Sequence, residues 1–305
     1  MAGFAELAPR LQQALLLDWD AQELRGPQFL RPDGVARKKL AGLVSPRSDA
    51  AVTWSVFRTL QRLPAQGWLP HVLRPQAHHG DWDPAEFTWW SSVPAPRSHL
   101  LWLLDHMDGL APAEVTQQAA ALARLTKVAE QRDGWKRMVA EGADRGDGVL
   151  EPAFEADLVI TTPGHVVVVM GVYQHDIERR TFWDAHRDAL ARGLDTALEL
   201  AGPDRVPWLL FVTDDYRHEG PETRAMAYEA LASRYSSDRA FLAARLPSRD
   251  AAQIDRLAGQ LRWLSWADLL DVVLDHSSGL PGDGRLMLRR LVDYLHGKQL
   301  LFKGG

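Results

Sequence analysis

The sequence contains no cysteine, so disulfide bonds, thiolate-based zinc sites, iron–sulfur clusters and cysteine nucleophiles are excluded. It also lacks a long apolar segment, and the run at residues 166–170 is far too short to span a bilayer. The N-terminus shows no basic segment followed by a sustained apolar run, as a signal peptide would have. We therefore expect a soluble, cytoplasmic protein with no membrane partner.

An excess of basic charge is missing as well. The formal net charge is −5, with 35 Lys and Arg residues against 40 Asp and Glu residues. A strongly basic tail for nucleic-acid binding is thereby excluded, and any contact with phosphates would need a local basic patch. The acidic total does not exclude nuclease chemistry, because carboxylates that bind metal add negative charge themselves.

The chain does have enough apolar residues for a packed core. Hydrophobic residues make up 46% of the 305 residues, and charged residues make up 25%, close to the globular average. The patterns predict a mainly helical N-terminal portion, residues 1–140, packed on an α/β core, residues 141–305. Helices are predicted over residues 4–19, 48–63, 97–108 and 112–138, and a loop-rich segment over residues 73–96.

The centre of the chain has the pattern of an α/β core. Residues 154–161 and 165–173 predict two strands, joined at the turn signal Pro163-Gly164. The uninterrupted apolar run at 166–170 favours a strand covered on both faces. The elements predicted further on are helix 182–201, strand 206–213, helix 221–234, strand 261–264, helix 266–274 and helix 286–295. A hairpin followed by a helix and a buried strand is an α/β order.

The hairpin also carries a likeness to a known family. Segment 155–172, which begins Glu-Ala-Asp-Leu-Val-Ile, resembles the central hairpin of the PD-(D/E)XK nuclease superfamily. Segment 183–195 is similar to the helix after that hairpin, 52–60 to an N-terminal helix of some bacterial members, and 261–266 to a late strand-to-helix step. The resemblance covers roughly residues 45–275. It implies a restriction-endonuclease-like fold, in which helices flank a mixed central sheet.

In that superfamily the first strand of the hairpin supplies an Asp, and the second supplies an acidic residue and, two positions later, a Lys. Because side chains two residues apart share one face of a strand, the acids converge on Mg²⁺ and the Lys lies beside them. Asp157 matches the first position. Met170 and Val172 stand at the other two, and neither can bind a hard cation or hold a charge.

Asp157 is therefore the candidate metal ligand, and Glu155 is a candidate helper on the same strand face. Both have a structural alternative, in which a hydrogen bond or salt bridge holds Asp157 and Glu155 lies on an exposed polar face. A lone Asp supplies too little charge to retain Mg²⁺. Met170 and Val172 are expected to be core residues that fill the former pocket.

A second interpretation keeps activity by moving the lost groups. A downstream acid would complete a Mg²⁺ site with Asp157, and Arg187 would replace the charge of the lysine. The candidate residues past the strand are His175, Asp176, Glu178, Asp184 and Asp188. Arg187 and Arg192 are also candidate phosphate contacts, and a solvated helix surface is their alternative.

The remaining candidates have suitable residue types, and each has a plain structural alternative. They are the basic run Arg37-Lys38-Lys39, the loop residues His78, His79, Asp81 and Asp83, and the tryptophans Trp82, Trp89 and Trp90. Their functional interpretations are phosphate binding, metal binding and stacking on bases, respectively. Their alternatives are solvent exposure, a polar loop and packing beneath a long loop.

Two functions follow from these observations. The preferred one is a catalytically inactive nuclease-like protein with a nucleic-acid-binding or structural role, which the resemblance places in a bacterial defence or DNA-handling system. The alternative is an active Mg²⁺-dependent endonuclease with relocated site residues. The partner would be DNA or another nucleic acid, or else a protein, and the inactive form would need no cofactor.

Overall fold

The structure is a computed structural model. It describes residues 39, 42–43, 45, 48–73, 81–109, 127–142, 150–178, 181, 184, 186–214, 224–278, 280 and 282–301. The helix predicted over 4–19 and most of the one predicted over 112–138 lie outside these residues. Within the described ranges, no helix is both long and apolar enough to cross a membrane.

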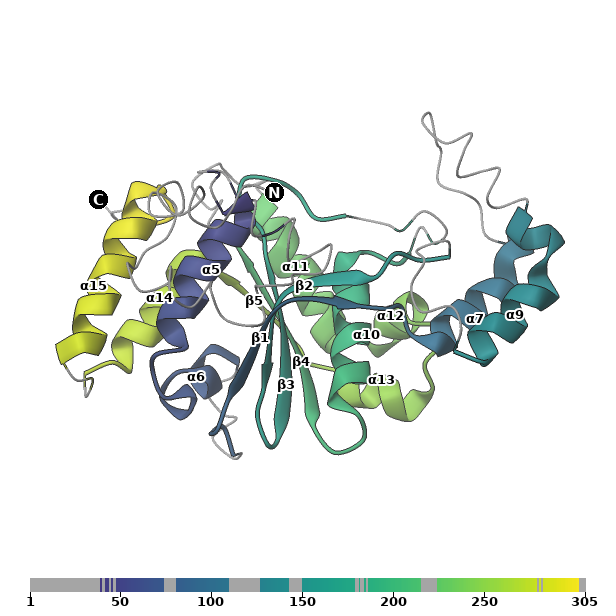
Figure 1. The fold of residues 1–305 in the computed structure, drawn as a ribbon, viewed down its shortest axis with the longest axis horizontal. Helices are drawn as coiled ribbons and strands as arrows, with labels where there is room; N and C mark the ends of the chain where they lie inside the picture. Colours follow the sequence, from purple (N-terminus) through teal and green to yellow (C-terminus); the bar gives the residue numbers. More distant parts are fainter. Residues whose placement is uncertain are drawn as a thin grey trace, which may run out of the picture.

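A five-stranded mixed sheet runs through the centre of the molecule (Figure 1). In order across the sheet, its strands are β1 (Glu86–Val93), β2 (Phe154–Thr161), β3 (His165–Gly171), β4 (Val206–Thr213) and β5 (Leu261–Ser265). β2 is antiparallel to both β1 and β3, whereas β3, β4 and β5 run parallel. The predicted mixed α/β sheet is confirmed, and so is the pairing of the hairpin strands.

The strand β1 corrects the prediction of a loop-rich segment over residues 73–96, because Glu86–Val93 pairs along β2. The pattern of this strand is hidden by Trp89 and Trp90, which are adjacent and both buried. Trp90 has a positive φ of 54°, which breaks the regular alternation of side chains. The N-terminal portion is therefore not only helical, since it supplies one edge strand of the central sheet.

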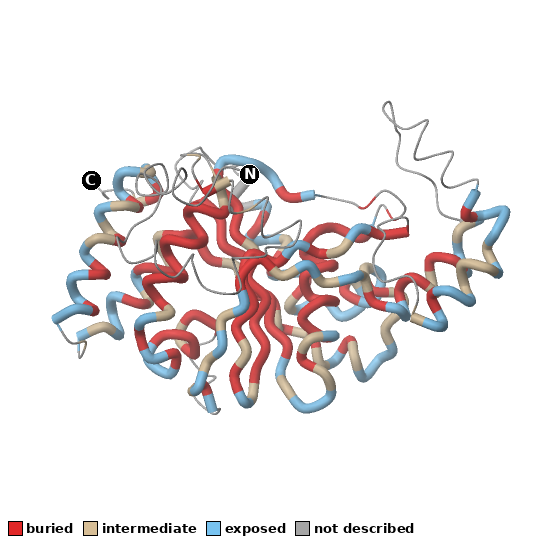
Figure 2. Tube along the Cα trace, viewed as in Figure 1, coloured by how far each residue is buried: buried red, intermediate tan, exposed pale blue. Residues whose placement is uncertain are grey.

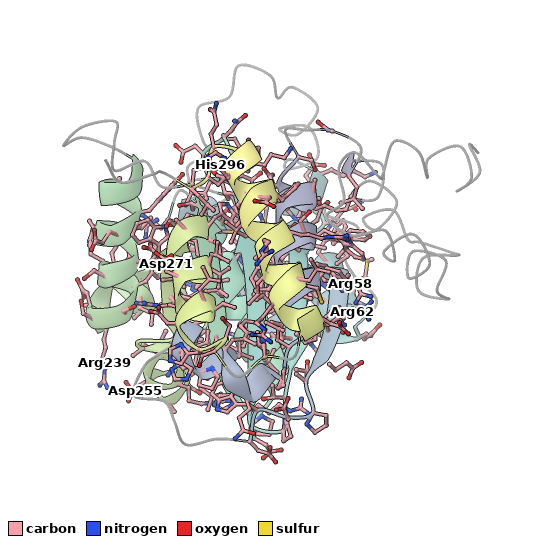
Figure 3. All side chains as sticks on the ribbon, turned by 90° about the vertical axis from the view of Figure 1, so that its left-hand side faces the viewer. Arg58, Arg62, Arg239, Asp255, Asp271 and His296 are labelled. Atoms are coloured by element: carbon pink, nitrogen blue, oxygen red, sulfur yellow. The ribbon has the colours of Figure 1, made fainter. Side chains whose placement is uncertain are left out.

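Helices cover both faces of the sheet (Figures 1 and 3). One face carries α5 (Asp49–Leu60), α6 (Leu69–Leu73), α14 (Trp266–Asp275) and α15 (Gly282–Gly297). The other carries α10 (Ala189–Ala201), α11 (Arg224–Ser237), α12 (Arg239–Arg245) and α13 (Ala251–Leu257). Each face has its own apolar cluster, and Figure 2 shows buried residues concentrated along the strands and the inner sides of the helices.

A small helical unit lies at one end of the molecule (Figure 1). It contains α7 (Arg97–His106) and α9 (Arg132–Ala140), which pack Leu100, Leu104 and Val139 into a third apolar cluster. Two short 3-10 turns, η1 (Ala65–Gly67) and η2 (Met107–Gly109), follow α5 and α7.

The helix α5 brings a polar end to the open end of the hairpin, just past the end of β3. Ser48 caps it, with its side chain accepting a hydrogen bond from the Ala51 amide, and Asp49 lies in the first turn. Both features favour a helix start at this point. Trp54 and Phe57 are fully buried against the sheet, so the helix is firmly packed where Asp49 emerges. The predicted helix over 48–63 is confirmed, with its end three residues earlier.

Candidate functional site

A pocket of about 360 Å³ lies where β2 begins and β3 ends. Its walls come from β2, the end of β3, the segment after β3, the start of α5 and the first turn of α10. The charged or titratable residues that line it are Lys39, Asp49, Glu155, Asp157, His175, Asp176, Glu178 and Arg192. Asp157 and Glu155 thus lie in one pocket with several other residues that the sequence suggested as candidates, and with Asp49, which it did not suggest.

Both carboxylate oxygens of Asp157 are engaged. Lys39 Nζ lies 2.7 Å from Oδ1, and the Gly171 amide donates to Oδ2 at 2.9 Å. The side chains of Lys39 and Asp157 are only 19% and 4% exposed, so water screens the pair weakly. Burial acts to lower the pKa of Lys39, but the Asp157 carboxylate outweighs it, and the pKa is raised. A salt bridge and a hydrogen bond therefore hold Asp157, as its structural alternative predicts.

The sequence does not reveal the pairing of Lys39 with Asp157. It belongs to a basic run whose other members, Arg37 and Lys38, lie outside the described residues. Its partner Asp157 is 118 positions away, so no local spacing links the two side chains. Lys39 is therefore neither a solvated cation nor a free phosphate contact.

Asp49 belongs to the same pocket. Its Oδ1 accepts a hydrogen bond from the Tyr173 amide at 3.1 Å, and its Oδ2 lies 2.8 Å from His175 Nε2. Burial raises the pKa of Asp49, with His175 opposing this shift and the Asp157 carboxylate adding to it. In the sequence Asp49 looks like an ordinary residue at a helix start, so its role at the pocket was missed.

Met170 and Val172 line the same pocket as Asp157. Val172 belongs to the apolar cluster on the α10 side, and Met170 packs against that cluster. Lys39 pairs with Asp157 in this pocket, and Asp49 of the first turn of α5 also lines it. Val172 is buried, which confirms its expected core position.

Gly171 and Tyr173 face the α5 side of the sheet. A Cβ on Gly171 would point at Thr53 of α5 and Trp266 of α14. Tyr173 is part of the apolar cluster on that side. Met170 and Val172 face the other side, because successive residues of a strand alternate between the two faces. Neither glycine nor tyrosine supplies a carboxylate or an ammonium group to Asp157.

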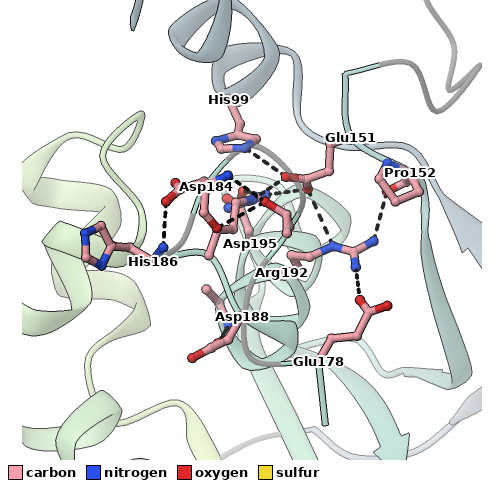
Figure 4. Close-up of polar contacts among 12 residues, drawn as sticks. His99, Glu151, Pro152, Glu178, Asp184, His186, Asp188, Arg192 and Asp195 are labelled. Carbon is pink, nitrogen blue, oxygen red and sulfur yellow. Dashed lines mark hydrogen bonds and ion pairs between the residues drawn. The ribbon is translucent and has the colours of Figure 1, made fainter. Parts of the chain in front are cut away.

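Arg187 does not line the pocket of Asp157 but lies in a buried ionic network (Figure 4). Its Nε and Nη2 donate to the two oxygens of Glu151 at 2.7 and 3.0 Å, and Nη2 also donates to Asp195 at 2.8 Å. Burial acts to lower the pKa of Arg187, but these carboxylates outweigh it and raise the pKa. The prediction that Arg187 replaces the motif lysine is therefore wrong.

Arg192 reaches the pocket and is only 7% exposed, so a solvated helix surface is the wrong description of it. It donates to the exposed Glu178 at 3.1 Å and to the main-chain oxygens of Pro152 and Ala153 at 2.9 and 3.2 Å (Figure 4). These bonds tie α10 to the segment that leads into β2. A phosphate group would have to compete with them for the guanidinium.

The downstream acids do not assemble a metal site with Asp157. Asp188 caps α10, which begins later than predicted, and also accepts a hydrogen bond from Tyr235. Asp176 accepts one from Tyr228, and Asp184 accepts one from the amide of residue 186. Among the residues that the structure describes, no group of three or more His, Asp or Glu side chains could hold a metal ion. The described carboxylates therefore do not fit a Mg²⁺ ion.

The candidate tryptophans and the candidate residues of the loop before β1 have structural rather than binding contacts where the structure describes them. Trp82, Trp89 and Trp90 are buried, which confirms packing rather than an open stacking surface. Trp82 stacks on His165 with ring centroids 3.8 Å apart. Asp83 accepts a hydrogen bond from the amide of residue 66. His78 and His79 lie outside the described residues.

Fold and pocket together define an α/β protein whose central hairpin ends in a buried aspartate paired with a lysine. Comparisons with protein-family models, with curated proteins and with solved structures found no match. The relation to PD-(D/E)XK nucleases thus depends on the sequence resemblance alone and stays a prediction.

The Lys39–Asp157 pair should be measurable as a coupling. Lys39→Met is expected to lower the free energy of unfolding by about 2 kcal/mol, because a buried carboxylate loses its cation and the partial exposure of Lys39 moderates the cost. Asp157→Asn should cost a similar amount. In the double variant, the loss should be smaller than the sum by about 1 to 2 kcal/mol. Urea denaturation of the unchanged protein, the two single variants and the double variant measures these free energies of unfolding. If the losses of the two single variants simply add up in the double variant, the interaction between Lys39 and Asp157 contributes nothing to stability.

Proposed function

We propose that this protein is a catalytically inactive member of the PD-(D/E)XK nuclease-like class that acts through binding or as a structural component. The observation that carries the proposal is the Lys39–Asp157 pair at 2.7 Å. The carboxylate expected to bind metal already has a cationic partner, and its second oxygen accepts a hydrogen bond from the Gly171 amide. A lysine ammonium at this distance opposes the approach of a divalent cation.

The surroundings of the pair support the same conclusion. A Mg²⁺ ion needs several oxygen ligands in octahedral geometry. Asp49, the nearest acid from α5, already interacts with His175 and with the Tyr173 amide. Gly171 offers no side chain where a second carboxylate would face Asp157.

The basic residues bear on the kind of partner. Lys39, Arg187 and Arg192 were candidates for phosphate contact, and all three are engaged with carboxylates. None of them is a free cation on the surface. This arrangement favours a structural or protein-binding role over direct phosphate contact at this pocket, although nucleic acid remains the partner that the family resemblance implies.

A nuclease assay tests the proposal. Purified protein with Mg²⁺ or Mn²⁺ is expected to leave supercoiled DNA, linear DNA and RNA intact, and Asp157→Ala should behave in the same way. Metal-dependent cleavage that disappears in Asp157→Ala but persists in Glu155→Ala, a change at an exposed position of the same strand, would overturn the proposal. Cleavage that is equal in all three proteins would indicate a contaminating nuclease.

One observation favours a second candidate, an active Mg²⁺-dependent endonuclease. Lys39 brings a lysine ammonium to Asp157 although β3 supplies none, and Asp49 and Glu155 are close enough to influence its pKa. If the protein is such an endonuclease, the unchanged chain should cleave nucleic acid with Mg²⁺, and Lys39→Met should abolish that cleavage. If it is catalytically inactive, neither the unchanged chain nor Lys39→Met should cleave.

A further inference from the structure

A second cavity, of about 350 Å³, lies between α11 and the residues around the start of α10. Its size falls in the range of small-molecule sites. Ile177, Leu231 and the ring of Tyr228 form an apolar wall. Ile177 and Tyr228 are buried and belong to the cluster on the α10 side, so this wall is part of the packed core.

Two arginines supply positive charge to the same cavity. The guanidinium groups of Arg234 and Arg245 lie 4.0 and 4.8 Å from the ring centroid of Phe241, which holds both by cation–π contact. Arg245 Nη1 donates to the main-chain oxygen of His186 at 2.5 Å, which fixes its position further. Within the described part of the chain, no carboxylate forms an ion pair with Arg234.

Among the described residues, Asp188 is the one acid that lines the cavity, and it is largely engaged by other groups. Its Oδ1 accepts hydrogen bonds from the Ala191 amide at 2.9 Å and from the Tyr235 hydroxyl at 2.6 Å. Its Oδ2 lies 3.7 Å from Arg245 Nη1, beyond hydrogen-bond distance. Burial also raises the pKa of Asp188. The carboxylate therefore does not neutralise both arginines, and the cavity keeps donors for an anion.

We propose that this cavity is a binding site for a small organic anion with an apolar body. A carboxylate or phosphate group would be bound by Arg234 and Arg245, since guanidinium groups match the geometry of both anions. The apolar body would lie against Ile177 and Leu231. This proposal uses no residue of the Lys39–Asp157 pair, so it does not depend on the function proposed above.

Titration calorimetry with the full chain tests the chemistry of the site. Phenyl phosphate is expected to bind with a dissociation constant of about 1 mM or tighter. Inorganic phosphate, which lacks the apolar body, should bind at least about tenfold more weakly. The neutral benzyl alcohol and the cationic benzylamine should also bind at least about tenfold more weakly, because neither has an anionic group that the arginines can bind. Equal binding of benzylamine and phenyl phosphate would overturn the proposal.

Three variants locate the binding. Arg234→Met removes one cation, Leu231→Trp fills the cavity, and each should weaken phenyl phosphate binding about tenfold or more. Arg239→Met is the control, because Arg239 is an exposed arginine of α12 that pairs with Asp255 away from the cavity (Figure 3). It should bind like the unchanged protein, and circular dichroism checks that all three fold. No saturable binding at millimolar concentration, or binding that survives both cavity variants, would overturn the proposal.

Discussion

Replacing Glu151 by glutamine is expected to destabilise the protein by about 3 to 5 kcal/mol, because the change removes one of the two carboxylates that pair with the buried Arg187. The side chains of Glu151 and Arg187 are 2% and 1% exposed, and two hydrogen bonds join them. Glu151 also lies 2.9 Å from His99 Nε2, so it links the helix α7 to the core (Figure 4). Urea denaturation of both proteins at neutral pH measures the difference.

The same pair predicts a pH dependence. Burial opposes the charged form of Glu151, but Arg187 and His99 outweigh it and lower the pKa from 4.5 to about 2. A carboxylate with a lowered pKa stabilises the folded state above its unfolded value, and this contribution, about 3 kcal/mol, is lost as the pH falls from about 4.5 through about 2. The stability difference between the unchanged protein and Glu151→Gln should therefore be constant above about pH 5 and shrink below about pH 4.5.

Glu178→Gln is the matched control for this experiment. Glu178 also pairs with an arginine of the network, Arg192, but its side chain is 72% exposed. An exposed ion pair contributes about 0 to 1 kcal/mol, so this variant should stay close to the unchanged protein at every pH. If Glu178→Gln and Glu151→Gln lost equal free energy of unfolding, burial would not be the reason why Glu151 is important for stability.

Much of the fold could be predicted from local sequence patterns. The apolar runs of β2 and β4 and the turn between β2 and β3 are local signals, and the structure has β2 and β4 with the predicted bounds. The helix predicted over 266–274 is present as α14, and Ser265 caps it by accepting a hydrogen bond from the Asp268 amide. These elements are predictable because each is determined by neighbours within a few residues.

The contacts that define the site are of another kind. Lys39 and Asp157 are 118 positions apart, and His99 and Glu151 are 52 positions apart, so no sequence spacing reveals either pair. The helix predicted over 182–201 begins only at Ala189 in the structure. It begins there because the side chain of Asp188 caps α10. Prediction from the pattern therefore located Asp157 and allowed for a salt bridge to it, but it could not name Lys39 as the partner.

The position after Met170 offers the sharpest test of why the hairpin carries no second acid. Gly171→Ala is expected to destabilise the protein by about 3 kcal/mol, at the upper end for overpacking. A Cβ there would lie 2.2 Å from Thr53 Oγ1 and 3.0 Å from the ring of Trp266, and both side chains are fully buried. Gly134→Ala is the control, since the helix α9 has open space at that position and the change should stabilise it by about 0.5 to 1 kcal/mol.

Thr53→Ala should partly rescue Gly171→Ala, because it removes the oxygen that the new methyl group meets first. The rescue should be incomplete, since the ring of Trp266 keeps its place. A double-mutant cycle in urea measures the coupling, and an unrescued loss would show that the strain lies elsewhere. If methyl is already too large, a glutamate at 171 requires the core between β3, α5 and α14 to be rebuilt. The packing of these helices on the sheet then excludes a carboxylate at this position, and a single substitution cannot introduce one.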